Sequence, residues 1–253
     1  MSESTVATLD TVSSEEQQLR VDIAAAFRLL HRHGMSDLVA GNISARLPGA
    51  DWFFTHPHGH FFDEMKASDL IKVDMDCQPL NGPDERVHRS AVRQGAWSFK
   101  ARPDVNVVMH AHGMPIMAVS ALKRGLLPIS EFAFIFYKGV AYLEGDFQFA
   151  DEYMDRLGEA LQGNRVVIYN NHAFLLVAET VAEAFLLAYM LKQACELQIK
   201  VLSTSDEVIT PSPETCERHY NSYFGNPYAK YDGSAEWPGL LRSLDREDPS
   251  YRD

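Results

Sequence analysis

Long apolar runs, paired cysteines and excess positive charge are all missing from this chain of 253 residues. No stretch approaches the roughly 18 uncharged apolar residues that cross a bilayer, so we expect no membrane partner. The 3 cysteines are scattered and form no CxxC pair. This pattern excludes a disulfide framework and favours a reducing, cytoplasmic location. The formal net charge of -12 excludes nucleic acid as a partner, because phosphate binding requires a basic face.

Composition divides the chain into three regions. Residues 1–12 are polar and acidic, without the basic flank and apolar block of a secretory signal, and we expect a flexible tail there. Residues 13–204 combine helical and strand patterns and are long enough for one domain with a full core. Residues 205–253 are rich in Pro, Tyr, Gly and Trp. We expect this extension to pack on its own subunit or on a neighbouring one.

Helical patterns lie at both ends of the domain and strand patterns lie between them. The first helix begins with Ser13 and Glu16, a capping box, and the last begins with Thr180 and Glu183. This order favours an α+β or three-layer αβα fold, with a central, mainly antiparallel sheet flanked by helices. We expect helices at 13–34, 84–101, 115–123, 150–163 and 180–202, and strands within 42–47, 51–56, 68–76, 103–112, 126–143 and 164–179.

The segment VMHAHGM places two histidines, His110 and His112, directly after a run of strand formers. Alternate side chains of a strand share one face, so both imidazoles point the same way from a rigid support. Zinc and similar ions bind imidazole nitrogens at about 2.0–2.1 Å, and a third ligand must come from elsewhere. His172, in YNNHAF at a strand end, is the best candidate. The alternative is that each histidine is an ordinary polar residue satisfied by a hydrogen bond.

A second run, THPHGH, contains His56, His58 and His60. Pro57 and Gly59 interrupt this run, so strand geometry is not expected, and a turn splays the three side chains. We expect a loop beside a substrate, or a plain surface turn, rather than a metal site.

Six segments together resemble the class II aldolase/adducin head family, which includes L-fuculose-phosphate aldolase and L-ribulose-phosphate 4-epimerase. The resemblance covers about residues 15–253, and the closing segment is similar to the tail of an adducin-like branch. It implies the class II aldolase fold. The matching segments are AGNISAR (40–46), THPHG (55–59), KASDLIKVD (66–74), RPDVNVVMHAHG (102–113), NNHAF (170–174) and TVAEAFLLAYMLKQACELQ (180–198).

The resemblance implies one divalent metal ion per subunit, either Zn, Mn, Fe or Co, with His110, His112 and His172 as ligands. The family also places an acidic residue ahead of the two-histidine strand. Asp84, in PDERVH, matches this position and would be a fourth ligand or a catalytic base beside the metal. The adjacent Glu85 is the alternative catalytic residue, and a further alternative is that both acids simply begin a helix.

Two segments resemble the substrate loops of the family. In GNISAR, Asn42 and Ser44 would supply hydrogen-bond donors and Arg46 would pair with a carboxylate. The alternative is a β-turn with a surface arginine. THPHG matches a second substrate loop, with His58 facing the pocket and Gly59 beside it.

The resemblance also bears on the substrate and on proton transfer. Gly82 and Pro83 stand where aldolase relatives carry a serine pair that helps to bind phosphate, so the usual phosphate site is incomplete. Glu131, in PISEFAF, falls near the place where family enzymes put a further acid/base residue at a subunit interface. Burial in this apolar run would raise its pKa and suit proton transfer. A strand-edge glutamate is the alternative.

Family enzymes are cyclic homotetramers with active sites between neighbouring subunits, and the resemblance implies the same assembly here. Aromatic residues of the extension would then reach the adjacent site or cover their own subunit. These residues are Tyr220, Tyr223, Tyr228, Tyr231 and Trp237.

An ion held by three histidines keeps an open position, which suits catalysis on a small-molecule carbonyl substrate. The resemblance therefore implies a metal-dependent carbon–carbon lyase, an aldolase or a decarboxylase. It would act through a metal-bound enolate on a non-phosphorylated keto acid or aromatic carboxylate. One alternative is a non-heme iron oxygenase that uses the same three histidines on an aromatic keto acid. Another is a non-enzymatic, adducin-like interaction domain.

Overall fold

A central sheet of seven strands organises the part of the chain that the computed structural model describes, residues 13–84, 86–146, 148–205, 207–225 and 231–253. The strand order is β3-β2-β1-β4-β7-β6-β5, and only the β5–β6 pair is parallel. The expected mainly antiparallel sheet is therefore confirmed. The strands are β1 (Asn42–Ala45), β2 (Trp52–Thr55), β3 (Ile71–Asp74), β4 (Val107–Ala111), β5 (Val140–Glu144), β6 (Val166–Asn170) and β7 (Phe174–Ala178).

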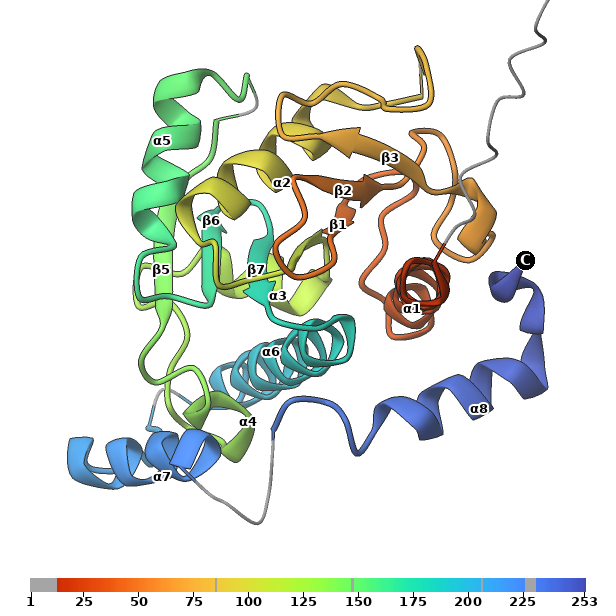
Figure 1. Ribbon diagram of the computed structural model, residues 1–253. Helices are drawn as coiled ribbons and strands as arrows, with labels where there is room; N and C mark the ends of the chain where they lie inside the picture. Colours follow the sequence, from red (N-terminus) through yellow and green to blue (C-terminus); the bar gives the residue numbers. More distant parts are fainter. Residues whose placement is uncertain (1–12, 85, 147, 206, 226–230) are drawn as a thin grey trace, which may run out of the picture.

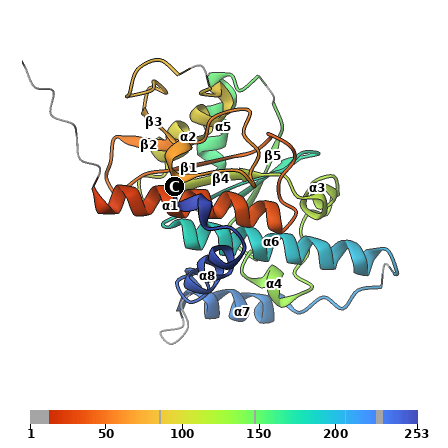
Figure 2. The same ribbon diagram turned by 90° about the vertical axis from the view of Figure 1, so that its right-hand side faces the viewer.

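Helices cover both faces of this sheet, as Figures 1 and 2 show. The long helices α1 (Ser14–Arg32) and α6 (Val181–Leu202) lie on one face, and α2 (Arg89–Ala101) and α5 (Asp151–Ala160) lie on the other. The three-layer αβα prediction is thereby confirmed. The remaining helical elements are α3 (Met114–Ser120), α4 (Glu131–Phe134), α7 (Pro213–Gly225), α8 (Trp237–Glu247), η1 (Ala67–Asp69) and η2 (Pro249–Arg252).

Strand β4 lies at the centre of the sheet and is buried along its whole length. Because side chains alternate along a strand, β4 contributes to two separate cores. Val107 and Met109 pack in the core beneath α1 and α6, whereas Val108 packs in the core beneath α2 and α5. The same alternation directs His110 toward the α2 side of the sheet.

The predicted helix caps are present at both long helices. The Ser13 hydroxyl accepts a hydrogen bond from the backbone N–H of Glu16 at 3.1 Å. The Thr180 hydroxyl accepts one from the N–H of Glu183, also at 3.1 Å. Each cap satisfies one of the donors that a helix N-terminus leaves without an intrahelical partner.

Two expectations for secondary structure are wrong. Residues 126–143 form the short helix α4 followed by β5, rather than one or two strands throughout. The Ser130 hydroxyl accepts from the N–H of Ala133 and begins this helical turn, a local hydrogen bond that overrides the apolar, aromatic pattern. Helix α2 begins at Arg89 rather than at 84, since Asp84 instead closes a turn with Arg86.

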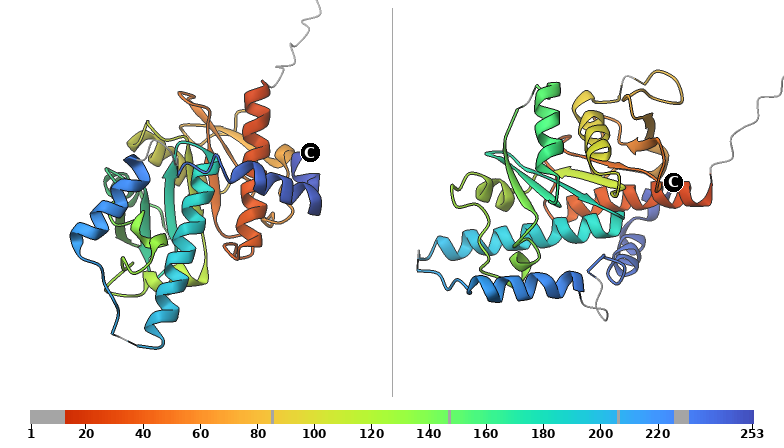
Figure 3. Two further views of the ribbon diagram at one scale, coloured as in Figure 1. Left: turned by 90° about the horizontal axis from the view of Figure 1, so that it is seen from below. Right: turned by 60° about the vertical axis from the view of Figure 1, so that its left-hand side comes forward.

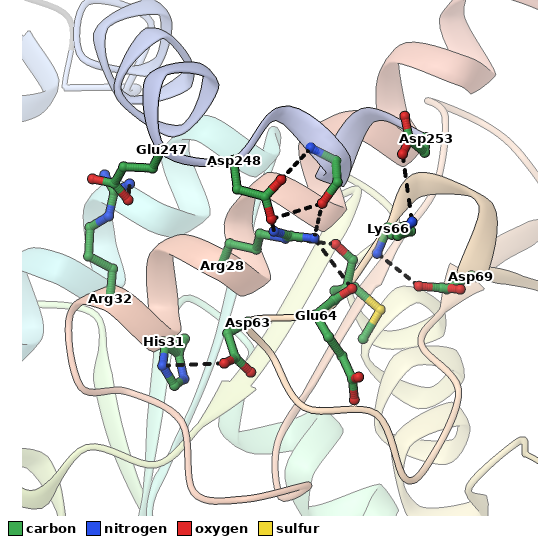
Figure 4. Close-up of polar contacts among 12 residues, drawn as sticks. Arg28, His31, Arg32, Asp63, Glu64, Lys66, Asp69, Glu247, Asp248 and Asp253 are labelled. Carbon is green, nitrogen blue, oxygen red and sulfur yellow. Dashed lines mark hydrogen bonds and ion pairs between the residues drawn. The ribbon is translucent and has the colours of Figure 1, made fainter.

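The C-terminal extension lies outside the layer of α1 and α6, and its helices α7 and α8 pack on α4 and α1 (Figure 3). The buried Arg28 of α1 holds the end of this extension in place through hydrogen bonds (Figure 4). The guanidinium donates to the Asp248 carboxylate at 2.6 Å and to the Ser250 hydroxyl at 2.9 Å. It also donates to the backbone carbonyl of Met65 at 3.0 Å, which ties the extension to the loop before η1.

None of the helices in the described part of the chain is long and apolar enough to cross a membrane.

Replacing Arg28 with Ala should lower the free energy of unfolding by about 2–4 kcal/mol, since buried carbonyls lose a charged donor. Urea unfolding followed by circular dichroism measures this change. Arg32→Ala is the matched control on the same helix. It removes an ion pair with the largely exposed Glu247 and should cost under about 1 kcal/mol. Equal losses in the two variants would contradict the role assigned to Arg28.

Candidate metal centre

Three histidines converge at the end of β4. His110 is on the strand, His112 follows it in the turn before α3, and His172 lies in the β6–β7 turn. The turn brings His172 in because Asn171 adopts a left-handed backbone, with a φ of 58°, and the N–H of His172 donates to the carbonyl of Tyr169. The end of β4 and the turn between β6 and β7, which lie side by side because β4 pairs with β7, therefore supply all three rings.

The three rings have the spacing that a shared cation requires. One ligand atom of each lies within 4.8 Å of the others, and Nε2 of His112 is 3.1 Å from Nε2 of His172. Two nitrogens bound to one tetrahedral ion at about 2.0–2.1 Å lie roughly 3.3 Å apart. The side chains present thus fit a divalent ion with only small adjustments.

Hydrogen bonds at the far side of two rings orient them toward this common point. Nδ1 of His110 donates to the carbonyl of Phe174 at 2.7 Å, and Nδ1 of His112 lies 3.3 Å from the carboxylate of Asp37. A carbonyl can only accept, so the proton of neutral His110 is on Nδ1 and the lone pair is on Nε2. Such partners fix the tautomer and orientation of metal-binding histidines.

The environment keeps His110 and His172 neutral, which is the form of imidazole that binds metal. Burial, with the nearby His112 and His172, lowers the pKa of His110 from 6.5 to about 3. Burial and His112 lower the pKa of His172 to about 4. A neutral imidazole with a free lone pair is a ligand, whereas an imidazolium is not.

A pocket of about 350 Å³ opens in front of the three rings. It is lined from several parts of the chain by small, apolar and imidazole side chains. Gly41 forms part of the wall, and a Cβ there would lie 2.9 Å from both the carbonyl oxygen of His110 and the ring of Phe62. The lining residues are Val39, Ala40, Gly41, Asn42, His56, His58, His88, Ser90, Ala91, Gln94, His110, His112, Phe149 and His172.

The predicted substrate residues are only partly brought to this pocket. Asn42 pairs with His110 across the sheet and lines the pocket, and its Nδ2 group has no hydrogen-bond partner in the described part of the chain. His58 also lines the pocket. Ser44, Arg46 and Gly59 are not among its described lining residues.

The strand geometry explains why Ser44 and Arg46 are elsewhere. Each step of two residues along β1 moves a side chain roughly 6.6–6.8 Å away from Asn42. Ser44 faces Gly95 of α2, where an added Cβ would lie 2.7 Å from the hydroxyl oxygen. The guanidinium of Arg46 lies over the ring of Phe99 and donates to the carbonyl of Val105 at 3.0 Å. Arg46 therefore stabilises the fold rather than facing the pocket.

Asp84 lies away from the three histidines, contrary to the expected position beside the metal. Its carboxylate accepts two hydrogen bonds from the Arg86 guanidinium, at 2.7 and 2.9 Å, and these lower its pKa. Gly82, Pro83 and Asp84 line a separate cavity of about 700 Å³. Glu85, the alternative to Asp84, lies outside the described residues. The expected incomplete phosphate site was inferred from Gly82 and Pro83. These two residues do not line the histidine pocket, so they say nothing about phosphate binding there.

Glu131 is also separate from the three histidines within one chain. It is exposed on α4, contrary to the expected burial, and lines another pocket of about 470 Å³ together with Tyr223 and Tyr231. The Tyr223 hydroxyl donates to the backbone carbonyl of Glu131 at 2.8 Å. Trp237 packs against Phe185 of its own chain. The predicted Tyr228 lies outside the described residues.

Sequence reasoning missed Asp37, His88 and Gln94. Asp37 lies in the loop before β1, and no sequence pattern links it to His112. His88 is the N-cap residue of α2 and its ring lies 4.5 Å from the ring of His58. A signal for His88 did exist, because it is the histidine that ends PDERVH, the segment matched to the acidic position of the family. His56, the buried histidine of THPHGH, forms part of the pocket floor, and its Nδ1 has no hydrogen-bond partner among the described residues.

Comparison with known proteins places this site in context. The family model described as Class II Aldolase and Adducin N-terminal domain matches residues 21–199. A Caulobacter vibrioides protein named after the class 2 aldolases is 36% identical over 96% of this chain and 95% of its own length. Mouse alpha-adducin is 31% identical over 91% of this chain, which spans 33% of that protein.

Two solved structures share the fold over nearly the whole chain. The aldolase II superfamily protein from Pseudomonas syringae has a TM-score of 0.88 and 32% identity, covering 96% of this chain and 98% of that one. The L-fuculose 1-phosphate aldolase from Glaciozyma antarctica has a TM-score of 0.82 and 25% identity, covering 98% and 97%. The αβα architecture is therefore that of these proteins.

Removal of the His110 imidazole should abolish tight metal binding. Loss of a residue that only orients a ligand costs about 10–100-fold in affinity, and loss of a ligand should cost at least about 100-fold. Zn²⁺ titration by calorimetry, with His110→Ala compared with wild type, measures the change. Asp37→Asn should give an intermediate loss, and His31→Ala, on the exposed side of α1, should match wild type. Full metal occupancy in His110→Ala would contradict the site.

His56 should make the metal-free protein sensitive to acid. Burial lowers the pKa of His56 from 6.5 to about 3, so the unfolded chain binds this proton at a higher pH than the native state. The free energy of unfolding should therefore fall below pH 6.5, by about 1.4 kcal/mol per pH unit from this group. Urea unfolding at pH 7 and pH 5 in the presence of a chelator should show a smaller loss for His56→Phe than for wild type. Identical losses would exclude His56 as a source.

Proposed function

Because the chain belongs to the family of class II aldolases and adducin N-terminal domains, we propose that it is a divalent-metal-dependent carbon–carbon lyase. The reaction would be an aldol cleavage or a decarboxylation, and the substrate a non-phosphorylated keto acid or an aromatic carboxylate. The single observation that carries this proposal is the convergence of three imidazoles at the floor of a pocket.

His110, His112 and His172 would hold the ion, which could be Zn, Mn, Fe or Co. When bound, it would supply a Lewis acid that polarises a carbonyl and stabilises negative charge on oxygen. Three protein ligands leave a further coordination position, as in catalytic rather than structural sites.

The charge of the pocket supports a substrate without phosphate. Its described lining residues include neither lysine nor arginine. A phosphate group is normally held by such cations or by several backbone N–H groups. A volume of about 350 Å³ suits a small molecule.

Protein side chains around the ion would position the substrate. The unpartnered amide Nδ2 of Asn42 would donate a hydrogen bond to a substrate oxygen, and that bond would offset the cost of burying the amide. Phe149 would cover part of the substrate and limit access of water.

A catalytic role for Glu131 depends on how the subunits assemble. This side chain is exposed and lies outside the pocket of its own chain. Glu131 would serve as an acid/base residue only if a cyclic homotetramer placed it in the site of a neighbouring copy. Light scattering on the purified protein measures the oligomeric state.

The two alternatives have less support from the site. The sequence FAFIFY at 132–137 gives the oxygenase some support because its aromatic side chains suit an aromatic substrate. Phe132 of this segment, however, lines the pocket that contains Glu131 and not the histidine pocket. The similarity to alpha-adducin allows an interaction domain without catalysis. Three converging imidazoles, two of them oriented by hydrogen bonds, favour a metal-dependent enzyme instead.

A partial reaction tests the lyase proposal without knowledge of the complete substrate. Protein loaded with Zn²⁺, Mn²⁺, Fe²⁺ or Co²⁺ is incubated with pyruvate and longer 2-keto acids in D₂O, and loss of the C3 proton signal is followed by NMR. Aromatic carboxylates are assayed in parallel for release of CO₂.

We expect exchange or CO₂ release with at least one compound, and loss of it in His110→Ala. The rate should be the same in air and under argon, whereas dependence on oxygen would favour the oxygenase. The proposal would be overturned if, for every metal and every substrate, the wild-type protein exchanged protons and released CO₂ no faster than His110→Ala.

A further inference from the structure

Lyase chemistry of this kind needs a group that takes or returns a proton at the reacting carbon. Carboxylates often serve this purpose. Among the described residues that line the histidine pocket, however, none is an aspartate or a glutamate. The ionisable side chains in that lining, apart from the three candidate metal ligands, are His56, His58 and His88.

His58 and His88 form a pair at the mouth of the pocket. Their rings are stacked, with centroids 4.5 Å apart and an angle of 28° between the planes. Both side chains are exposed, in contrast to His56, which is 2% exposed on the floor. A group at the mouth can exchange protons with solvent after each transfer, whereas buried His56 cannot do so easily.

The backbone and a neighbouring hydroxyl fix this pair. The N–H of His58 donates to the backbone carbonyl of Arg86 at 2.7 Å, which joins the 56–60 loop to the segment before α2. Nδ1 of His88 is 2.7 Å from the Ser90 hydroxyl. Because Nδ1 is engaged, Nε2 is the nitrogen of His88 that remains for a ligand.

The electrostatic surroundings favour a neutral His88 that is ready to accept a proton. Partial burial of the ring and the nearby His58 lower the pKa of His88. His88 is also the N-cap residue of α2, where the helix dipole disfavours a cation. The other titratable and charged groups around the pair include His56 and His60 in the same loop, the Asp84–Arg86 ion pair before His88, and Arg89, which follows it in α2.

We propose that His88, supported by His58 and Ser90, is the proton-transfer residue of this pocket and takes the place of a carboxylate. This inference rests on the proposed lyase function.

In the forward step with a 2-keto acid, the C3–H bond breaks and its proton moves to Nε2 of His88. The electron pair of that bond becomes the C2=C3 double bond, and the carbonyl π pair moves to oxygen, so that an enolate and an imidazolium form. In a decarboxylation, the bond to the carboxylate breaks and its electron pair becomes the enolate as CO₂ leaves. His88, protonated beforehand from solvent at the mouth of the pocket, then gives its Nε2 proton to the carbon that CO₂ has left.

Exchange of the C3 proton in Co²⁺-loaded protein tests the step. His88→Gln should lose about 100-fold or more in rate, because general acid–base catalysis contributes 10²–10⁴-fold. The visible spectrum of bound Co²⁺ should remain unchanged, since the three ligands are intact. His31→Gln, an exposed histidine on α1, is the matched control and should keep the wild-type rate and spectrum.

The rival residues are tested in the same assay. Loss of exchange in Glu85→Gln, Asp84→Asn or Glu131→Gln, with exchange retained in His88→Gln, would overturn the proposal and leave the lyase function intact. Full exchange in His88→Gln alone would also overturn it.

An NMR titration tests the pair without any turnover. The pKa of His88 is measured from its ring C–H signal, assigned by its loss in His88→Gln, in Zn²⁺-loaded protein with and without oxalate. Oxalate is a planar dianion that binds metal ions and resembles an enolate. An anion close to His88 should raise this pKa by about 1 unit, and His58→Gln should raise it in the absence of oxalate.

An unchanged pKa of His88 in saturating oxalate would place the ring too far from the reacting atoms and would overturn the proposal. Because this measurement needs no reaction, it separates failure of the histidine pair from failure of the lyase function.

Discussion

The alternation of side chains along one central strand is the constraint on which the rest of this structure depends. Odd-numbered residues of β4 pack beneath α1 and α6, and even-numbered residues face α2. This parity sends His110 away from the larger core and toward a pocket. The cross-strand register then sets Asn42 directly opposite His110, so that a hydrogen-bond donor stands beside the candidate ligand. A shift of register by one residue would turn both side chains to the wrong face.

Much of this arrangement could be predicted from the sequence. The αβα layers, the mainly antiparallel sheet and the caps of the two long helices follow from periodicity and local capping chemistry. The convergence of His110, His112 and His172 followed from a strand, a turn and a family resemblance, and the three rings do lie together. These features depend on local geometry that a few neighbouring residues determine.

The rest depends on contacts between distant segments, which periodicity does not report. Asp84 matches an acidic family position, yet a local turn with Arg86 holds its carboxylate elsewhere. Arg46 has the right residue type for a carboxylate ligand, but strand geometry carries it onto Phe99. Conversely, Asp37 reaches the site through a loop whose path no pattern indicates, and His88 reaches it from the N-terminus of α2. Residue types could be read from the sequence more easily than the directions in which their side chains point.

The three candidate metal-binding rings stand at the end of β4 and in the β6–β7 turn, whereas loops supply much of the remaining pocket lining. This separation has a consequence for divergence within the family. The imidazoles add little to the two cores, which consist of apolar side chains on both faces of the sheet. Under the proposed function, substitution of a ring would therefore abolish catalysis while the fold remains, and changes in the loops would alter substrate choice without removing a metal ligand. One architecture can thus give rise both to catalysts of differing selectivity and to inert scaffolds, without any redesign of its hydrophobic interior.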